Sequence, residues 1–329
     1  MKRAAAALFS LLALSGCARS PLGYLEGAGP AARSIASLGW GLLAISVAVC
    51  LITGALLAFS IFRRRLPADG LVAGGDDRSS LRWIGVGLSI TTVLLLASAV
   101  WTLWTVRGLS DTSRAATLTI DVTGQQWWWE VRYRSGTPAR EFSTANDLVI
   151  PAGVPVQLNL RSRDVVHSFW VPKLAGKMDM IPGQTNTIRI EADQPGIYRG
   201  QCSEFCGVQH AQMAFFVVAL APADFEAWWN HQLEPAGNDA DAAPQRTFIE
   251  RCSSCHTIRG LPAGGILGPD LSHFGSRRTI AAGVLPNNPT GLARWLNDSQ
   301  AVKPGSKMPT LRLTANEVDA LTSYLEGLK

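Results

Sequence analysis

Hydrophobic residues first gather in two long runs. Residues 34–62 and residues 83–106 contain no charged side chain. Each run exceeds the ~20 residues that an α-helix needs to cross the hydrocarbon core of a bilayer. A helix buried in a soluble domain is the alternative, but arginines flank both runs. We therefore expect two membrane-spanning helices.

Arginine is distributed unequally around these runs. The connecting loop, residues 63–82, holds five, whereas the segment before the first run, residues 17–33, holds two. The five are Arg63, Arg64, Arg65, Arg78 and Arg82, and the two are Arg19 and Arg33. Because cytoplasmic loops are rich in Lys and Arg, the loop is predicted to be cytoplasmic. The processed N-terminal segment, residues 17–33, and everything after Arg107 are then outside.

The N-terminus reads as a secretory signal over residues 1–16. Lys2 and Arg3 precede an apolar stretch and then small residues. Leu14-Ser15-Gly16-Cys17 resembles a bacterial lipoprotein processing site, which would make Cys17 a lipidated N-terminus. Ordinary signal cleavage beside a chance cysteine is the alternative. A single lipid would add little to two spans.

From about residue 115 the hydrophobic period becomes two. Apolar residues alternate with polar ones in three runs: Leu118, Ile120, Val122; Trp129, Val131, Tyr133; and Val156, Leu158, Leu160. Pro151-Ala152-Gly153 and Pro182-Gly183 mark turns, and residues 187–192 and 213–220 supply further strands. This pattern predicts an all-β sandwich or barrel over residues 115–222.

Helical signals return near the C-terminus. A short helix is expected over Pro222–Trp229, followed by a polar, Ala- and Pro-containing linker at 233–244 and a last domain at 245–329. Thr314 and Glu317 form a capping box that begins a final helix. One stripe of that helix is apolar: Val318, Leu321, Leu325 and Leu328.

Composition narrows the class of protein. A chain of 329 residues has room for two or three domains, and the 47% hydrophobic content is explained by the local runs. The net charge is only +5, and no basic cluster is interleaved with aromatic residues, so nucleic acid is not an expected partner. Four of the six cysteines fall in two cofactor motifs, which leaves no disulfide framework.

The first of these motifs gathers soft metal ligands. Cys202, Cys206, His210 and Met213 lie within twelve residues, and His167 offers a second imidazole upstream. Thiolate, imidazole and thioether together favour copper over magnesium or calcium. A Cys202–Cys206 disulfide and a structural zinc site are the alternatives, but neither uses the methionine.

These residues resemble subunit II of haem–copper cytochrome c oxidase over most of residues 35–220. The pattern is Cys-x-Glu-x-Cys-Gly-x-x-His-x-x-Met, preceded by Asp-Val-x-His-Ser-Phe-x-Val-Pro. The resemblance implies a cupredoxin fold and a dinuclear copper centre, CuA. The implied ligands are His167, Cys202, Cys206, His210, Met213 and the Glu204 carbonyl. The Glu204 side chain would help to hold a magnesium ion at the boundary with subunit I; an ordinary solvated carboxylate is its alternative.

Three consecutive tryptophans follow Gln125-Gln126. On a strand they cannot all face one core, so at least one is expected to be exposed or at an interface. By the resemblance, Trp127 is where electrons enter CuA. Gln125 and Trp128 replace the usual His and Tyr, which leaves no assigned role for those two positions. Core packing is the competing interpretation for Trp129.

The last domain carries Cys252-Ser253-Ser254-Cys255-His256, the c-type haem attachment motif. Cys252 and Cys255 would form the thioethers and His256 would bind the iron. Met308, the only methionine after Met213, is the expected sixth ligand. His273 is the fallback ligand, with a surface histidine as its other interpretation. A redox-active Cys-x-x-Cys needs neither the adjacent histidine nor a haem domain. This domain is similar to class I cytochromes c, an all-α fold.

Together these features predict subunit II of a caa-type cytochrome c oxidase in a bacterial plasma membrane, with two spans and both cofactor domains on the periplasmic side. It would relay electrons from haem c through CuA to the oxygen-reducing centre of subunit I. Expected partners are subunit I, subunit III, a cytochrome c donor and membrane lipid. The alternatives are a membrane-anchored copper-delivery protein, another CuA/haem c electron carrier, and a quinol oxidase subunit lacking copper.

Overall fold

The computed structural model describes residues 20–62, 77–109, 115–236 and 242–329. It divides into two compact units, residues 33–113 and the remainder of the chain, and each is described by itself. The predicted signal segment 1–16 and the lipidation site Cys17 lie outside the described residues, as do residues 63–76 of the predicted loop.

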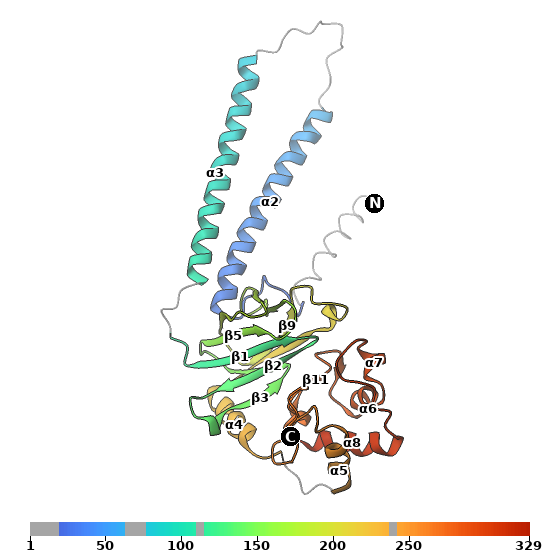
Figure 1. Cartoon of the computed structure of the whole chain (residues 1–329). Helices are drawn as coiled ribbons and strands as arrows, with labels where there is room; N and C mark the ends of the chain where they lie inside the picture. The colour runs from blue at the N-terminus through green and yellow to red at the C-terminus, as the bar shows by residue number, and fades with distance from the viewer. Residues whose placement is uncertain (1–19, 63–76, 110–114, 237–241) are drawn as a thin grey trace, which may run out of the picture. The chain divides into compact units, whose positions relative to one another are not determined.

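The two apolar runs form long helices, α2 (Pro30–Phe62) and α3 (Asp77–Leu109), drawn in blue and cyan in Figure 1. At 1.5 Å per residue, 33 residues reach about 50 Å, which is more than a bilayer core requires. Their most apolar windows are not buried by protein. Gly41 lies against the Trp101 ring, where a Cβ would clash with the ring, so a larger residue would push the helices apart.

Two five-stranded sheets form the β-sandwich (Figure 1). The first has the order β3-β2-β1-β5-β8, made by Phe142–Ala145, Trp128–Arg134, Leu118–Gln125, Val156–Ser162 and Asn186–Ile190. The second has the order β4-β10-β9-β6-β7, made by Asp147–Pro151, Ala214–Leu220, Gly196–Cys202, His167–Trp170 and Met178–Met180. β1 pairs with β5 in parallel and β10 with β4 in parallel, and every other pairing is antiparallel.

Alternating side chains fill the space between the sheets. Ile120 and Val122 of β1 lie beside Leu158 and Leu160 on the neighbouring strand β5, and all four are at most 1% exposed. The hydroxyl of Tyr133 on β2 crosses to the other sheet. It donates to the Val149 carbonyl at 2.9 Å and accepts from the Val149 N–H at 2.7 Å. The predicted all-β fold is confirmed.

The structure corrects two details of the sequence-based prediction. An unpredicted strand, β9, precedes the metal loop, so Cys202 is the last residue of a strand. The three tryptophans do not share one strand, because β1 ends at Gln125 and β2 begins at Trp128. Trp127 therefore lies in the turn. Alternation alone could not locate these features, since β9 contains Gly196 and Gly200, whose missing side chains hide its period.

Helix α4 (Pro222–Leu233) begins at the expected proline and packs Phe225 and Trp229 against the sandwich. Within the predicted linker 233–244, Ala236 donates its N–H to the Arg259 carbonyl, and α5 (Ala242–Arg251) already begins at residue 242. Residues 237–241 lie outside the described part of the chain.

The C-terminal domain, residues 242–329, has its own core. Its elements after α5 are α6 (Pro289–Asn297), α7 (Ser299–Val302), α8 (Ala315–Gly327) and the short strands β11 (Thr279–Ile280) and β12 (Leu285–Pro286). α8 packs on α5, with the rings of Phe248 and Tyr324 at 6.2 Å. The Thr314–Glu317 capping box is present and the predicted apolar stripe of α8 is buried, which confirms that helix.

Candidate copper and haem sites

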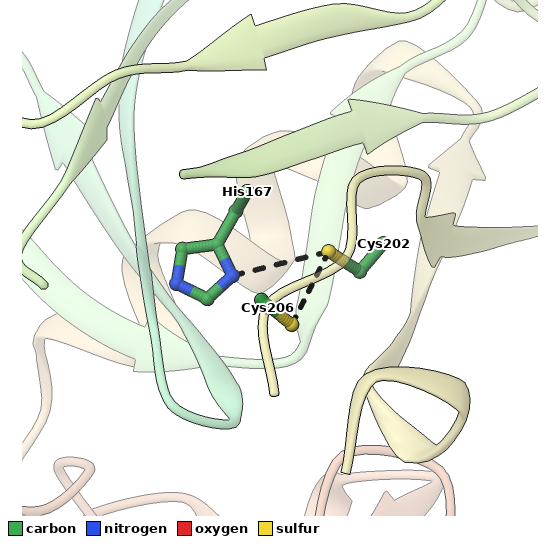
Figure 2. Close-up of side chains that lie close together, drawn as sticks. All are labelled: His167, Cys202 and Cys206. Carbon is green, nitrogen blue, oxygen red and sulfur yellow. Dashed lines mark hydrogen bonds between the residues drawn. The ribbon is translucent and has the colours of Figure 1, made fainter. Parts of the chain in front are cut away.

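Three potential metal ligands meet at one end of the second sheet. His167 begins β6, Cys202 ends β9 and Cys206 lies in the loop that follows (Figure 2). The Cys202 sulfur lies 3.8 Å from His167 Nδ1 and 3.8 Å from the Cys206 sulfur. All three side chains are at most 2% exposed. At this separation the two sulfurs are not bonded, so the structure has no Cys202–Cys206 disulfide.

The other three candidate ligands surround the same pair of sulfurs. His210 Nδ1 lies 3.7 Å and Met213 Sδ 3.8 Å from the Cys206 sulfur. The Glu204 carbonyl oxygen lies 3.3 Å from the sulfur of Cys202. Each sulfur thus has one imidazole nitrogen beside it and one weaker donor. The structure brings together every copper ligand that the sequence predicted.

The separations suit a shared pair of ions. Ligands at about 2.0–2.3 Å from a tetrahedral ion lie about 3.5 Å apart, close to the distances between these atoms. A structural zinc ion takes four ligands and would leave part of this six-donor set without a role. Two copper ions held by these residues would use all six donors. The donor set therefore fits the implied dinuclear copper centre.

The backbone of the loop explains how the two cysteines converge. Gly207 follows Cys206 with φ of +113°, a conformation that residues with side chains rarely adopt. A short 3-10 turn, η3 (His210–Gln212), then returns the chain to β10, and the Cys202 N–H donates to the Met213 carbonyl at 3.0 Å. The end of β9 and the start of β10 thus hold the two ends of the loop.

Asp164 is a candidate positioning residue that was not predicted from the sequence. Its carboxylate lies 2.9 Å from His167 Nε2 and accepts the Gln126 N–H at 2.8 Å. The carboxylate fixes the orientation of the imidazole and leaves Nδ1 facing the sulfurs. Its place three residues before His167, inside the quoted motif, was the available signal.

The two thiols titrate as a pair. The hydrogen bond with Cys206 lowers the pKa of Cys202 to about 3, and the same contact together with burial raises the pKa of Cys206. Two negative sulfurs 3.8 Å apart repel each other, so one thiolate is favoured and a second is not. Cationic metal would supply the charge that a second thiolate needs.

A second site occupies the C-terminal domain. A cavity of about 430 Å³ is lined by the attachment-motif residues Cys252, Cys255 and His256 and by Met308. Gly268 borders it so closely that a Cβ there would lie 2.5 Å from His256 Cε1. The size and lining fit a haem held between the motif and the Met308 loop.

His256 has the orientation and charge of an iron ligand. Its Nδ1 lies 2.8 Å from the Pro269 carbonyl, so Nδ1 donates and Nε2 is left free to bind iron. Burial lowers the pKa of His256, which favours the neutral imidazole that a metal requires. The haem would supply the redox-active iron.

His273 is not a surface residue, and that interpretation is wrong. It is 5% exposed, its Nδ1 lies 3.0 Å from the Lys329 carbonyl, and its ring lies 4.9 Å from that of His231. It does not line the cavity, whereas Met308 does. The fallback ligand therefore has no support from the structure.

Trp129 and Trp127 are both buried, but they lie in different surroundings. Trp129 is 1% exposed and packs on Phe169 and Phe215, so its core interpretation is confirmed. Trp127 is also buried, at 7%, and its Nε1 donates to the Cys206 carbonyl at 2.9 Å. A Cβ on Gly305 would lie 3.4 Å from its ring, so the Met308 loop covers it. Trp127 therefore lies where the sandwich meets the C-terminal domain.

The side chain and the carbonyl of Glu204 face different surroundings. The carbonyl lies beside Cys202, whereas the carboxylate is 44% exposed and lies 3.5 Å from Lys177 Nζ. An exposed carboxylate with one lysine neighbour satisfies the solvated interpretation and is also free to take another cation.

The fold and sites define a membrane-anchored electron-transfer protein with copper and c-type haem. Residues 134–220 match the family of the cytochrome c oxidase subunit II periplasmic domain, and residues 242–329 match cytochrome c. The chain is similar to cytochrome c oxidase subunit 2 of Alkalihalophilus pseudofirmus, with 32% identity over 98% of this chain and 95% of the relative. The corresponding subunit of Bacillus sp. strain PS3 is 32% identical over 98% of this chain and 96% of its own length.

A solved structure, the periplasmic domain of subunit II of cytochrome oxidase of Bradyrhizobium japonicum, shares 31% identity. The match covers 36% of the present chain and 94% of the Bradyrhizobium japonicum chain, with a TM-score of 0.33.

The chain belongs to the cytochrome c oxidase subunit 2 family. It is the electron-relaying subunit of an oxidase complex, uses CuA copper and haem c, and passes electrons toward subunit I. Family membership excludes the copper-delivery alternative.

Proposed function

We propose that electrons travel from the haem of the C-terminal domain through Trp127 to a dinuclear copper centre. The haem is held by Cys252, Cys255, His256 and Met308. The copper is held by His167, Cys202, Cys206, His210, Met213 and the carbonyl of Glu204. Trp127 joins the two groups.

One observation carries this route. The Trp127 indole donates to the carbonyl of Cys206, a proposed copper ligand, and its ring meets Gly305, three residues before Met308. The same side chain also lines the cavity that fits the haem. A single aromatic residue thus contacts the surroundings of both cofactors.

Replacement of Trp127 by phenylalanine is expected to keep both cofactor spectra and slow haem-to-CuA electron transfer. Phenylalanine cannot donate to the Cys206 carbonyl and gives a smaller contact. Aromatic contacts contribute ~0.5–1.5 kcal/mol beyond burial, so weakening this contact should lower the transfer rate by about two- to tenfold. Flash photolysis or stopped-flow absorbance would measure it.

Trp129→Phe is the matched control for this variant. It removes the same atoms from a core position, so it should lower the free energy of unfolding by roughly 1–3 kcal/mol and leave the transfer rate unchanged. Equal transfer rates in wild type and Trp127→Phe would show that electrons take another path.

The metal content tests the two sites directly. The full chain, produced with haem maturation but without its partner subunits, should contain two coppers and one iron and show a mixed-valence copper signal. One copper per chain, or none, would defeat the copper assignment, and a chain without covalent haem would defeat the haem assignment.

Four finer assignments complete the proposal. The half-exposed Glu204 carboxylate has the oxygen chemistry that magnesium prefers and would help to hold Mg²⁺ at the subunit I boundary. The arginine-rich loop would face the cytoplasm of a bacterial plasma membrane, with both cofactor domains periplasmic. Subunit III and a cytochrome c donor would complete the set of partners, and lipidation at Cys17 would add a minor anchor.

A further inference from the structure

Lys303 is buried although no carboxylate pairs with it among the described residues. Its side chain is 2% exposed, and its ammonium donates three hydrogen bonds to backbone carbonyls. The acceptors are Trp127 at 2.7 Å, Gln212 at 2.8 Å and Ala281 at 2.8 Å. An ammonium has three N–H groups, so this arrangement, the Lys303 contact, satisfies it completely.

Two of the three carbonyls belong to the β-sandwich, whereas Lys303 and Ala281 belong to the C-terminal domain. Gln212 directly precedes Met213 on the copper loop, and Trp127 is the residue of the proposed route. The lysine therefore joins the loop that carries Met308 to the copper loop and to the turn that carries Trp127. No other described lysine has this position.

Other contacts near Lys303 also join the β-sandwich to the C-terminal domain. The Gln209 side chain donates to the Pro304 carbonyl at 2.8 Å, and the Ala214 N–H donates to the Ala282 carbonyl at 3.0 Å. Gly283 has φ of +84°, and a Cβ there would lie 2.9 Å from the Ala214 Cβ, so only glycine allows this close approach.

The energetics single out the lysine within this junction. Removing an ammonium from water is unfavourable, and burial lowers the pKa of Lys303 to about 7. The three carbonyl dipoles offset that loss only when the two domains are together. Only the joined arrangement satisfies all three N–H groups within the protein, so the contact fixes how the two domains fit together.

We propose that Lys303 is the positioning residue that holds the haem-bearing domain against the copper loop, so that transfer between the cofactors needs no docking step. The consequence for electron transfer rests on the proposed haem-to-CuA route. The contact itself does not.

Replacing Lys303 with methionine in the complete oxidase tests the proposal. Methionine keeps most of the apolar stem and removes all three donors. Each charge-assisted hydrogen bond lost between the domains weakens their association by about tenfold or more. Flash-induced haem-to-CuA transfer should therefore slow by at least about tenfold, with Met-ligated haem and CuA spectra retained. It should also slow further when glycerol is added, because transient docking depends on viscosity.

Lys329→Met is the matched control, since Lys329 is an exposed lysine of the same domain. Surface substitutions of this kind have small effects, so this variant should change the rate by less than about threefold. Lys307 is not a control, because its side chain is 59% exposed but its Nζ lies 3.6 Å from the Asp164 carboxylate across the junction. A Lys303→Met enzyme with the wild-type, viscosity-independent rate would overturn the proposal, whereas a viscosity-dependent rate would support it because altered folding alone does not produce one.

Labelling of the unmodified oxidase gives an answer even if the variant fails to fold. Acetylation under native conditions, followed by mass spectrometry, should modify Lys307 and spare Lys303. Equal labelling of the two lysines would show that the Lys303 contact is not formed in most molecules and would overturn the proposal. Protection of Lys303 combined with an unchanged rate in Trp127→Phe would refute the route through Trp127 and leave the contact standing.

Discussion

Substitution of either sulfur ligand, Cys202→Ser or Cys206→Ser, is expected to abolish the dinuclear copper signal. The two sulfurs lie 3.8 Å apart and each has its own imidazole partner, so one alone cannot bridge and neutralise two ions. Loss of an outer-shell partner already costs about 10- to 100-fold in metal affinity, and loss of a bridging ligand should exceed that. Copper analysis and electron paramagnetic resonance of the purified variants would measure the effect.

Met213→Leu serves as the comparison for these variants. Its thioether lies beside only one sulfur, 3.8 Å from Cys206, and is a weak ligand. This variant should retain copper with an altered potential and slower transfer. A wild-type copper spectrum in either cysteine variant would contradict the ligand assignment.

Replacement of Met308 by alanine should change the haem more than any other substitution outside the attachment motif. The haem should remain covalently attached, because Cys252 and Cys255 are intact. The iron should lose its low-spin His/Met spectrum, and its potential should fall by the order of 0.1 V or more, since axial ligands set haem potentials over about 0.8 V. Optical spectra and redox titration would record both changes.

His273→Gln distinguishes the two candidate sixth ligands. His273 is bonded to the Lys329 carbonyl and lies outside the cavity lining, so its replacement should leave the haem spectrum as in wild type. A changed spectrum in His273→Gln, together with an unchanged one in Met308→Ala, would reverse the assignment.

Both cofactor sites could be predicted because their ligands are close in sequence. Cys202 to Met213 is one loop, and Cys252 to His256 is one turn, so the spacing alone limits the chemistry. The membrane helices and five of the ten sandwich strands (β1, β2, β5, β8 and β10) were also predictable, since burial on one face leaves a periodic pattern. His167 required the family motif, because 35 residues separate it from Cys202.

The relation between the sandwich and the C-terminal domain could not be predicted in this way. Lys303 bonds to a carbonyl 176 residues earlier, and backbone acceptors have no side-chain signature in a sequence. A lysine in a Gly/Pro loop reads as solvated. Trp127 was misplaced on a strand for a similar reason, because a turn of two residues between β1 and β2 interrupts no hydrophobic period.

The burial of Trp127 beneath the C-terminal domain has a consequence for soluble cytochromes that could donate electrons to the copper centre. With the ring 7% exposed beneath Gly305 and its backbone carbonyl bonded to Lys303, a soluble cytochrome finds this approach to the copper already occupied. On the proposed route, the C-terminal domain would exclude such a donor from this approach. An external donor would then give its electron to the resident haem, and a higher concentration of that donor would not open a shorter path.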